Sequence, residues 1–175
     1  MKIVAFAASN SSKSINKQLV TYAASLVDSA EVEILNISDF ELPLFGIDRE
    51  VELGQPELAK KFLEKLRGAD AIIISFAEHN LSYSAAYKNL FDWCSRIETK
   101  VYNDKPLLLL SASIGQHGGQ TVLGTALSTI PLFGGVIKAS LSIPNFNSNF
   151  DSNVGQLVDK ELIRKLKKAL NTLLN

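Results

Sequence analysis

Five short runs with the character of β-strands alternate with amphipathic segments along this chain, and this alternation limits the folds open to it. The runs at 2–8 (KIVAFAA), 69–76 (ADAIIISF) and 105–113 (KPLLLLSAS) are almost continuously apolar, which is typical of parallel strands buried on both faces. The runs at 31–37 and 136–143 complete the set. Between them, apolar residues recur at helical spacing. The pattern predicts an α/β protein with a parallel sheet and helices on both faces.

General rules for such sheets give the order of the strands. Right-handed crossovers and a length of 175 residues favour one doubly wound domain, covering 1–175, with the strand order 2-1-3-4-5. In that order the loops after the first and third strands flank a crevice, and the loop after the fourth strand lies beside it. We therefore expect the functional site at the carboxyl edge of the sheet. The stretches at 38–56 and 144–152 are expected to be connections.

Small polar residues follow the first strand and open the first helix. The stretch 8–16 (ASNSSKSIN) places the cation Lys13 and several hydroxyl or amide side chains around a helix N-terminus. Unpaired N–H groups and the helix dipole attract anions there. A phosphate, which needs several donors around its oxygens, suits this loop. The alternative is an ordinary serine-rich helix cap.

Two further polar loops follow the third and fourth strands, at 77–84 (AEHNLSYS) and 113–120 (SIGQHGGQ). They contain both histidines of the chain, His79 and His117. The glycines of the second of these loops let backbone approach a flat ligand closely and offer N–H donors to carbonyl oxygens. A planar heterocycle with a phosphate tail therefore fits the three loops better than a phosphate alone. Each histidine is equally consistent with an ordinary surface position.

Composition argues against several classes of function. The 18 basic residues balance the 18 acidic ones, so nothing indicates a nucleic-acid partner or attraction to a membrane surface. No apolar span has the length of a membrane helix, and the single Cys94 forms no internal disulfide. We expect a cytoplasmic protein. The chain lacks a Gly-x-Ser-x-Gly elbow, a P-loop motif and any metal-ligand spacing of His or Cys.

Four segments carry a resemblance to a known family. The stretch 8–16 is similar to a phosphate loop of the form G-S-x-R-x-x-S-x-N, and 77–80 (AEHN) is similar to a second loop, P-E-Y-N. The most specific motif, L-K-N-x-x-D-W-x-S-R, is present at 87–96 (YKNLFDWCSR), and a third, glycine-containing loop corresponds to 113–119. On these residues the chain resembles the NAD(P)H-dependent FMN reductase family, flavodoxin-like flavoenzymes that include quinone reductases and azoreductases.

The resemblance implies FMN as cofactor, NADPH or NADH as cosubstrate, and a small-molecule electron acceptor: a quinone, a free flavin or an azo compound. It places the phosphate on the first loop and the isoalloxazine ring beside 78–80 and 113–119. The implied cofactor-binding residues are Ser9, Ser11, Lys13, Ser14, Ile15, Asn16, Ala77, Glu78, His79, Asn80, Ser113, Gly115, His117, Gly118 and Gly119. Hydride chemistry belongs to the flavin, so no catalytic side chain or metal is implied. Because members of the family commonly form dimers, the resemblance also implies a homodimer or homotetramer. Its contacts are expected from the 83–96 helix and the apolar 40–45 segment.

The chain departs from the family pattern at several positions. Ser11 replaces the phosphate-binding arginine, which removes a bidentate clamp and leaves Lys13 as the available cation. Ala77 and His79 replace Pro and Tyr of the second loop, and Ser84 replaces a proline before the helix. Two other functions therefore stay open: a flavodoxin-like electron carrier, and a non-enzymatic nucleotide-binding module that has lost flavin. Because flavodoxins tend to be strongly acidic, the neutral charge favours the reductase over the carrier.

Overall fold

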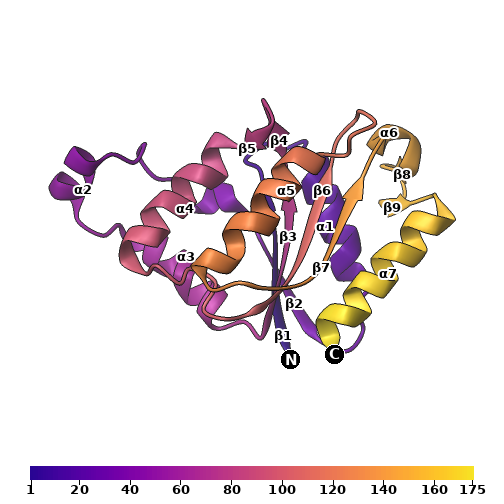
Figure 1. Cartoon of the computed structure of the whole chain (residues 1–175), viewed down its shortest axis with the longest axis horizontal. Coiled ribbons are helices and arrows are strands. Elements are labelled where there is room, and N and C mark those ends of the chain that lie inside the picture. The colour runs from indigo at the N-terminus through magenta and orange to yellow at the C-terminus, as the bar shows by residue number, and fades with distance from the viewer.

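A five-stranded parallel sheet in the order β2-β1-β3-β6-β7 forms the centre of the molecule. The computed structural model describes all 175 residues. The strands are β1 (Lys2–Ala8), β2 (Glu31–Leu35), β3 (Ala71–Phe76), β6 (Pro106–Ala112) and β7 (Val136–Ile143). Counted along the chain, this is the order 2-1-3-4-5 (Figure 1). The predicted flavodoxin-like, doubly wound α/β fold is therefore confirmed.

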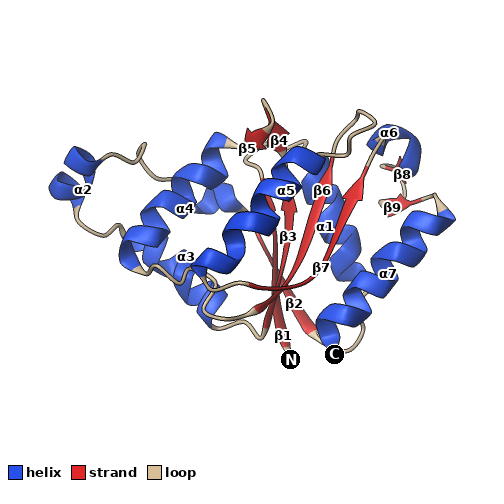
Figure 2. Cartoon of the chain, viewed as in Figure 1, coloured by secondary structure: helices blue, strands red, loops and turns tan.

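Alternate side chains of the central strands enter two separate cores. In β1, Val4 and Phe6 pack on one face of the sheet, whereas Ile3 and Ala5 pack on the other. Figure 2 shows helices on both sides of the sheet. The first face is covered by α3 (Glu57–Arg67), α4 (Ala85–Ile97) and α5 (Gln120–Thr129), and the second by α1 (Ile15–Ser25) and α7 (Lys160–Leu174). Because both faces are covered, every residue of β3 is buried, which explains its continuous apolar sequence.

Several short elements occupy stretches for which the sequence predicted no regular structure, or only the end of a neighbouring element. They are η1 (Ile37–Phe40), α2 (Ile47–Leu53), β4 (Glu78–His79), β5 (Ser82–Tyr83), η2 (Ile130–Phe133), α6 (Phe146–Asn149), β8 (Phe150–Asp151) and β9 (Gln156–Leu157). Each is too short for apolar periodicity to reveal it. The predicted strand at 31–37 ends at Leu35, because Asn36 caps η1. None of the helices has the length and apolar character needed to cross a membrane.

The carboxyl ends of three neighbouring strands lie level with one another. Ala8 of β1 pairs with Phe76 of β3, and Phe76 pairs with Ser111 of β6. The loops that follow these strands therefore leave the sheet at one edge, as predicted for the site. α2 lies apart from the sheet at one end of the molecule (Figure 1), and none of its residues is buried.

Candidate active site

The first loop, residues 9–14, is folded on itself before α1 begins. The Ser11 N–H donates to Ser9 Oγ at 3.3 Å, and the Lys13 N–H donates to Ser11 Oγ at 3.2 Å. Ser14 caps α1, because its Oγ accepts a hydrogen bond from the Lys17 N–H at 3.2 Å. Ser9 and Ser14 are buried, whereas Ser11 and Lys13 are exposed. The loop is thus held by hydrogen bonds to its own serines.

Backbone donors of this loop that have no acceptor within the protein include the N–H groups of Asn10, Ser12, Ile15 and Asn16. Two of them belong to the first turn of α1, where the helix dipole adds partial positive charge. The ammonium group of Lys13 makes no ion pair. This set of free donors matches the requirements of a phosphate group.

The side-chain amide of Asn16 is occupied by hydrogen bonds within the protein. It joins three parts of the sheet edge. Its Oδ1 accepts from the Ser75 Oγ–H at 2.8 Å and from the Ala112 N–H at 2.9 Å, and its Nδ2 donates to the Ala112 carbonyl at 3.2 Å. Asn16 is 2 % exposed and Ser75 is fully buried. Asn16 therefore offers a ligand its backbone N–H, while its amide fixes the start of α1 to the ends of β3 and β6.

The second loop is a short β-hairpin with a two-residue turn, where the sequence predicted a polar loop. Asn80 and Leu81 have φ angles of 48° and 62°, as in the type I′ turns that suit the twist of paired strands. Beside the turn, the Tyr83 hydroxyl is hydrogen-bonded to Thr129 Oγ1 at 2.9 Å. Burial raises the pKa of the Tyr83 phenol, so this group stays neutral at physiological pH. His79 and Asn80 are exposed at the tip.

Two side chains brace this hairpin against its neighbours. Glu78 Oε2 accepts a hydrogen bond from the Val122 N–H at 2.8 Å in the first turn of α5. The Ser84 Oγ–H donates to the Ala8 carbonyl at 2.8 Å, and the same oxygen accepts from the Tyr87 N–H at 3.2 Å as the cap of α4. Ser84 thus makes two hydrogen bonds through its hydroxyl group, and a proline at this position would make neither. Together with Asn16, these side chains hold the three loops in one frame.

The third loop, residues 113–119, is fixed by hydroxyl groups beneath it. The Gly118 carbonyl accepts from Ser111 Oγ at 2.8 Å and from Ser142 Oγ at 2.9 Å. Gly118 and Gly119 have φ angles of 62° and 76°, a region that favours glycine. Both are buried, so they serve the packing of the loop. The N–H groups at positions 115–117 find no acceptor within the protein and remain available to a ligand.

The structure brings every predicted site residue to the same edge of the sheet. Exposed there are Ser11, Lys13, His79, Asn80, Gly115 and His117; half-buried are Ile15, Glu78 and Ser113; buried are Ser9, Ser14, Asn16, Ala77, Gly118 and Gly119. The supporting residues Ser75, Ser111 and Ser142 were not singled out from sequence. Ser75 and Ser111 could have been noticed, because each is a serine inside an otherwise apolar strand and a buried hydroxyl requires a hydrogen-bond partner.

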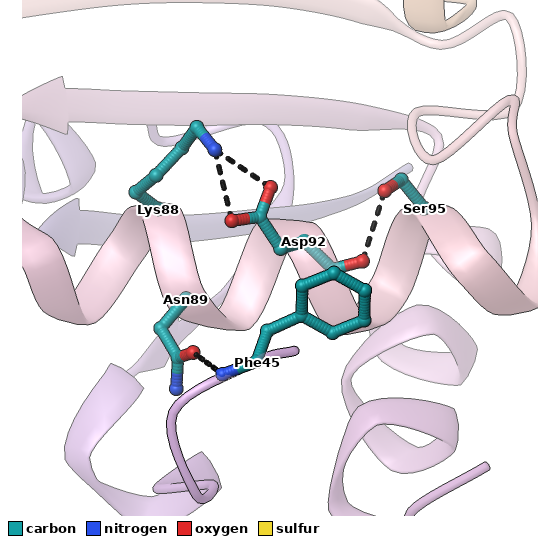
Figure 3. A network of polar contacts seen from close by, with 5 residues as sticks. All are labelled: Phe45, Lys88, Asn89, Asp92 and Ser95. Carbon is teal, nitrogen blue, oxygen red and sulfur yellow. Dashed lines mark hydrogen bonds and ion pairs between the residues drawn. The ribbon is translucent and has the colours of Figure 1, made fainter. Parts of the chain in front are cut away.

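The motif at 87–96 holds a distant segment against α4. The Asn89 amide accepts from the Phe45 N–H at 2.8 Å and donates to the Leu42 and Pro43 carbonyls at 3.0 and 3.1 Å. Figure 3 shows Asn89 facing Phe45, while Asp92 of the same helix faces Lys88. The indole N–H of Trp93 also donates to the Pro43 carbonyl, at 2.8 Å. We call Asn89 and Trp93, with the backbone of 42–45 that they hold, the clasp.

Comparison with known proteins identifies the family. The family model described as NADPH-dependent FMN reductase matches residues 1–148. An NAD(P)H-dependent FMN reductase of Pseudomonas aeruginosa is 30% identical over 177 residues, covering 97% of this chain and 93% of that protein. An NADPH:quinone oxidoreductase of Arabidopsis thaliana is 33% identical over 154 residues, covering 84% of this chain and 74% of that protein.

Solved structures agree at the level of the fold. The flavoenzyme NAD(P)H:(acceptor) oxidoreductase of Paracoccus denitrificans superposes with a TM-score of 0.78 at 20% identity, covering 99% of this chain and 94% of that chain. An FMN-dependent NADH-azoreductase of Bacillus anthracis in complex with FMN gives a TM-score of 0.65 at 13% identity, with 99% of both chains covered. The family model matches most of the chain, and the N–H groups left free at the sheet edge suit the phosphate of FMN. This protein therefore belongs to the NADPH-dependent FMN reductase family.

Proposed function

We propose that this chain, as one domain, is an oxidoreductase that binds FMN at the three loops and uses NAD(P)H to reduce a small organic acceptor, with a quinone as the preferred class. The observation that carries the proposal is the set of backbone N–H groups at Asn10, Ser12, Ile15 and Asn16, which lack acceptors in the protein. Family membership gives the cofactor, and two relatives are named as an NAD(P)H-dependent FMN reductase and an NADPH:quinone oxidoreductase.

The residues of the first loop fit the phosphate of FMN. The free N–H groups supply donors, and Lys13 supplies a point charge where the family has an arginine fork. The hydroxyl protons of Ser9, Ser11 and Ser14 remain available as well, because their oxygens act as acceptors in the loop. Phosphate binding would therefore rest on many neutral hydrogen bonds and one cation.

Hydride transfer is the chemistry that FMN supplies when bound. The chain's own part is to position the ring and to stabilise charge. The unpaired N–H groups at 115–117 can donate to an electron-rich ring edge, and Asn80 and His79 stand exposed on the neighbouring hairpin. Glu78 braces the site, since its Oε2 accepts the Val122 N–H at 2.8 Å. Its role is to keep the second and third loops at a fixed distance.

The visible absorption spectrum of the purified protein tests this function. Two flavin bands, present as purified or after addition of FMN, should bleach when NADPH or NADH is added without oxygen. Subsequent addition of a quinone should restore them. Bands that persist with both nucleotides would indicate an electron carrier, and no binding of FMN would contradict the proposed function altogether.

Restoring the arginine of the family pattern should strengthen FMN binding. The Ser11→Arg variant would add a bidentate donor to an exposed position next to the free N–H groups. We expect FMN to bind about tenfold more tightly, as one or two charge-assisted hydrogen bonds allow. Fluorescence titration of FMN measures the change. Ser128→Arg, at an exposed position of α5, adds the same charge elsewhere and should leave the affinity nearly unchanged. Equal affinities for Ser11→Arg and wild type would show that Lys13 and the backbone already suffice.

We also propose that the chain forms a homodimer or homotetramer through the segment that carries α2. Leu44, Ile47 and Val51 are 82%, 73% and 82% exposed, and Figure 1 shows α2 standing off from the body. Adjacent apolar side chains left in water indicate a covered surface. The Arg96–Glu50 ion pair at 2.9 Å holds α2 to the end of α4, so both regions would meet a second copy together.

Charged substitutions in α2 should dissociate this assembly. An Ile47→Asp/Val51→Asp variant loses the burial of two side chains, and each contributes roughly 1.5–3 kcal/mol. We therefore expect the dissociation constant to rise about a hundredfold or more, as seen by sedimentation velocity. Val158→Asp, at another exposed valine, should sediment like the wild type. A wild-type monomer at micromolar concentration would contradict the proposal.

A further inference from the structure

A cavity of about 200 Å³ lies between α4, the end of α5 and η2. Its apolar wall is almost entirely aromatic and consists of Tyr83, Tyr87, Phe91, Tyr102, Ile130 and Phe133. Among the lining residues Lys88 alone is exposed, so the cavity opens to solvent beside it. An apolar cavity of about 150 Å³ can hold benzene. A single aromatic ring with one small substituent therefore fits this space.

This cavity is separate from the regions to which other roles have been assigned. The ten-residue α5 lies between Thr129 and the third loop, which is about 15 Å at 1.5 Å per residue. On α4, Lys88 and Asp92 lie on the side away from Asn89 of the clasp (Figure 3). The cavity includes no residue of the first or third loop and none of α2. A ligand bound here would meet neither the flavin ring nor the proposed assembly surface.

One buried hydroxyl proton at the wall of the cavity has no acceptor within the protein. Tyr87 and Tyr102 are 3% and 1% exposed, and their hydroxyl groups are hydrogen-bonded to each other. That bond uses one of their two protons, and neither oxygen has a second partner in the protein. Burial raises the pKa of both phenols, so both protons are retained at physiological pH. Because a buried donor without a partner is costly, this wall is suited to a ligand that brings an acceptor.

The other polar side chains of the lining already have partners. Thr129 Oγ1 donates to the Thr125 carbonyl at 2.9 Å, so the Tyr83 hydroxyl must be the donor in its 2.9 Å bond to Thr129. Lys88 and Asp92 neutralise each other as an ion pair at 2.8 Å. A charged ligand would have to leave water without a free counter-charge, which is unfavourable. The lining therefore selects a neutral molecule with one acceptor oxygen.

We propose that this cavity binds a neutral, single-ring aromatic carbonyl compound, whose oxygen accepts the spare proton of the Tyr87–Tyr102 pair and whose ring packs against Phe91 and Phe133. The two phenylalanines already contact each other edge-on, with ring centroids 4.7 Å apart, an arrangement that a third ring can extend. The compound is held away from the flavin and is not reduced in this site.

Titration with 4-fluoroacetophenone tests the site, with the fluorine NMR signal of the compound as the readout. We expect a saturable change of this signal both with the protein as purified and with excess FMN. 1-Ethyl-4-fluorobenzene, which lacks the oxygen, should bind at least fivefold more weakly, since it cannot accept the proton. No saturable change, or equal binding of the two compounds, would overturn the proposal. Binding that disappears in excess FMN would place the ketone at the three loops and would overturn it as well.

The tyrosine pair predicts a distinctive pattern among variants. Tyr87→Phe and Tyr102→Phe each leave one hydroxyl proton without an acceptor, so each single variant should bind the ketone within about threefold of the wild type. The double variant has no such proton and should bind the ketone about tenfold more weakly, while its affinity for the hydrocarbon stays unchanged. Ketone binding by the double variant that equals wild type would contradict the assigned hydrogen bond.

A variant that narrows the cavity provides a second test. Ser95 is half-buried in the lining, and its hydroxyl bonds only to the Asp92 carbonyl of its own helix, at 2.9 Å. Ser95→Leu should therefore fold and bind the ketone at least tenfold more weakly. Ser128, outside the lining, makes the same kind of bond to the Thr125 carbonyl at 2.9 Å, so Ser128→Leu is the matched control and should bind like the wild type. Unaltered binding by a folded Ser95→Leu protein would show that the ketone lies elsewhere.

Discussion

Replacing Gly118 with alanine is expected to destabilise the protein by about 3 kcal/mol or more, the sum of a left-handed backbone and an overpacked site. An added Cβ would lie 2.2 Å from Ser142 Oγ, 2.9 Å from the Pro144 nitrogen and 3.0 Å from the Ile143 carbonyl carbon. Two of these atoms belong to backbone and have no room to move. The residue also has a φ of +62°. Urea unfolding followed by circular dichroism measures the loss.

A second glycine provides the control for this experiment. Gly124 in α5 has no atom within 4 Å of an added Cβ, and alanine favours helices by about 1 kcal/mol over glycine. Gly124→Ala should therefore stabilise the protein slightly. Adding Ser142→Ala to Gly118→Ala should recover part of the loss, because it removes the closest atom. A Gly118→Ala protein as stable as the wild type would mean that the third loop is held differently.

Asn16→Ala should cost about 4 kcal/mol of stability and also weaken FMN binding strongly. The substitution removes three buried hydrogen bonds and leaves Ser75 Oγ and both backbone groups of Ala112 without partners. Each buried group left unpaired costs about 1–3 kcal/mol. The start of α1 loses its attachment to the sheet as well, so the free N–H groups lose their fixed positions. Denaturant unfolding and FMN titration measure the two effects.

Asn10→Ala is the matched control for stability, because the Asn10 side chain makes no hydrogen bond within the protein. Its effect should stay within about 0.5 kcal/mol, as for other exposed positions. The double variant Asn16→Ala/Ser75→Ala should be less destabilised than the sum of the two single variants, since the two side chains share one bond. Strictly additive losses would contradict the assigned network.

The architecture was predictable because each central strand carries its own signal. Continuous apolar runs such as those of β3 and β6 arise only when both faces of a strand are covered, and the crossover rules then fix their order. α2 was not predictable, because none of its residues is buried and its sequence therefore lacks a core-facing stripe. The β4–β5 hairpin was not predicted either, since Asn80-Leu81 lacks the glycine that usually marks such a turn.

The gathering of the three loops at one edge of the sheet was predictable, but the direction of their side chains was not. The serines around Lys13 marked the helix N-terminus correctly. Sequence spacing alone gave no sign that the Asn16 amide turns inward to Ala112. The motif at 87–96 was informative about the family, yet what Asn89 and Trp93 hold emerges only when the segment at 42–45 is seen beside α4. Contacts between residues far apart in sequence carry no local pattern.

Asn16, Glu78 and Ser84 hold the backbone of the three loops, so substitutions at these residues and substitutions at the loop tips should have different effects. Exposed tip residues such as His79 and His117 make no hydrogen bond through their side chains. We expect variation at these tips to change which acceptor is used without altering the backbone beneath, whereas variation at Asn16, Glu78 or Ser84 should disturb all three loops together. A library confined to the tips should therefore yield mostly folded proteins with altered acceptor preference, and natural divergence of acceptor use can proceed by the same route.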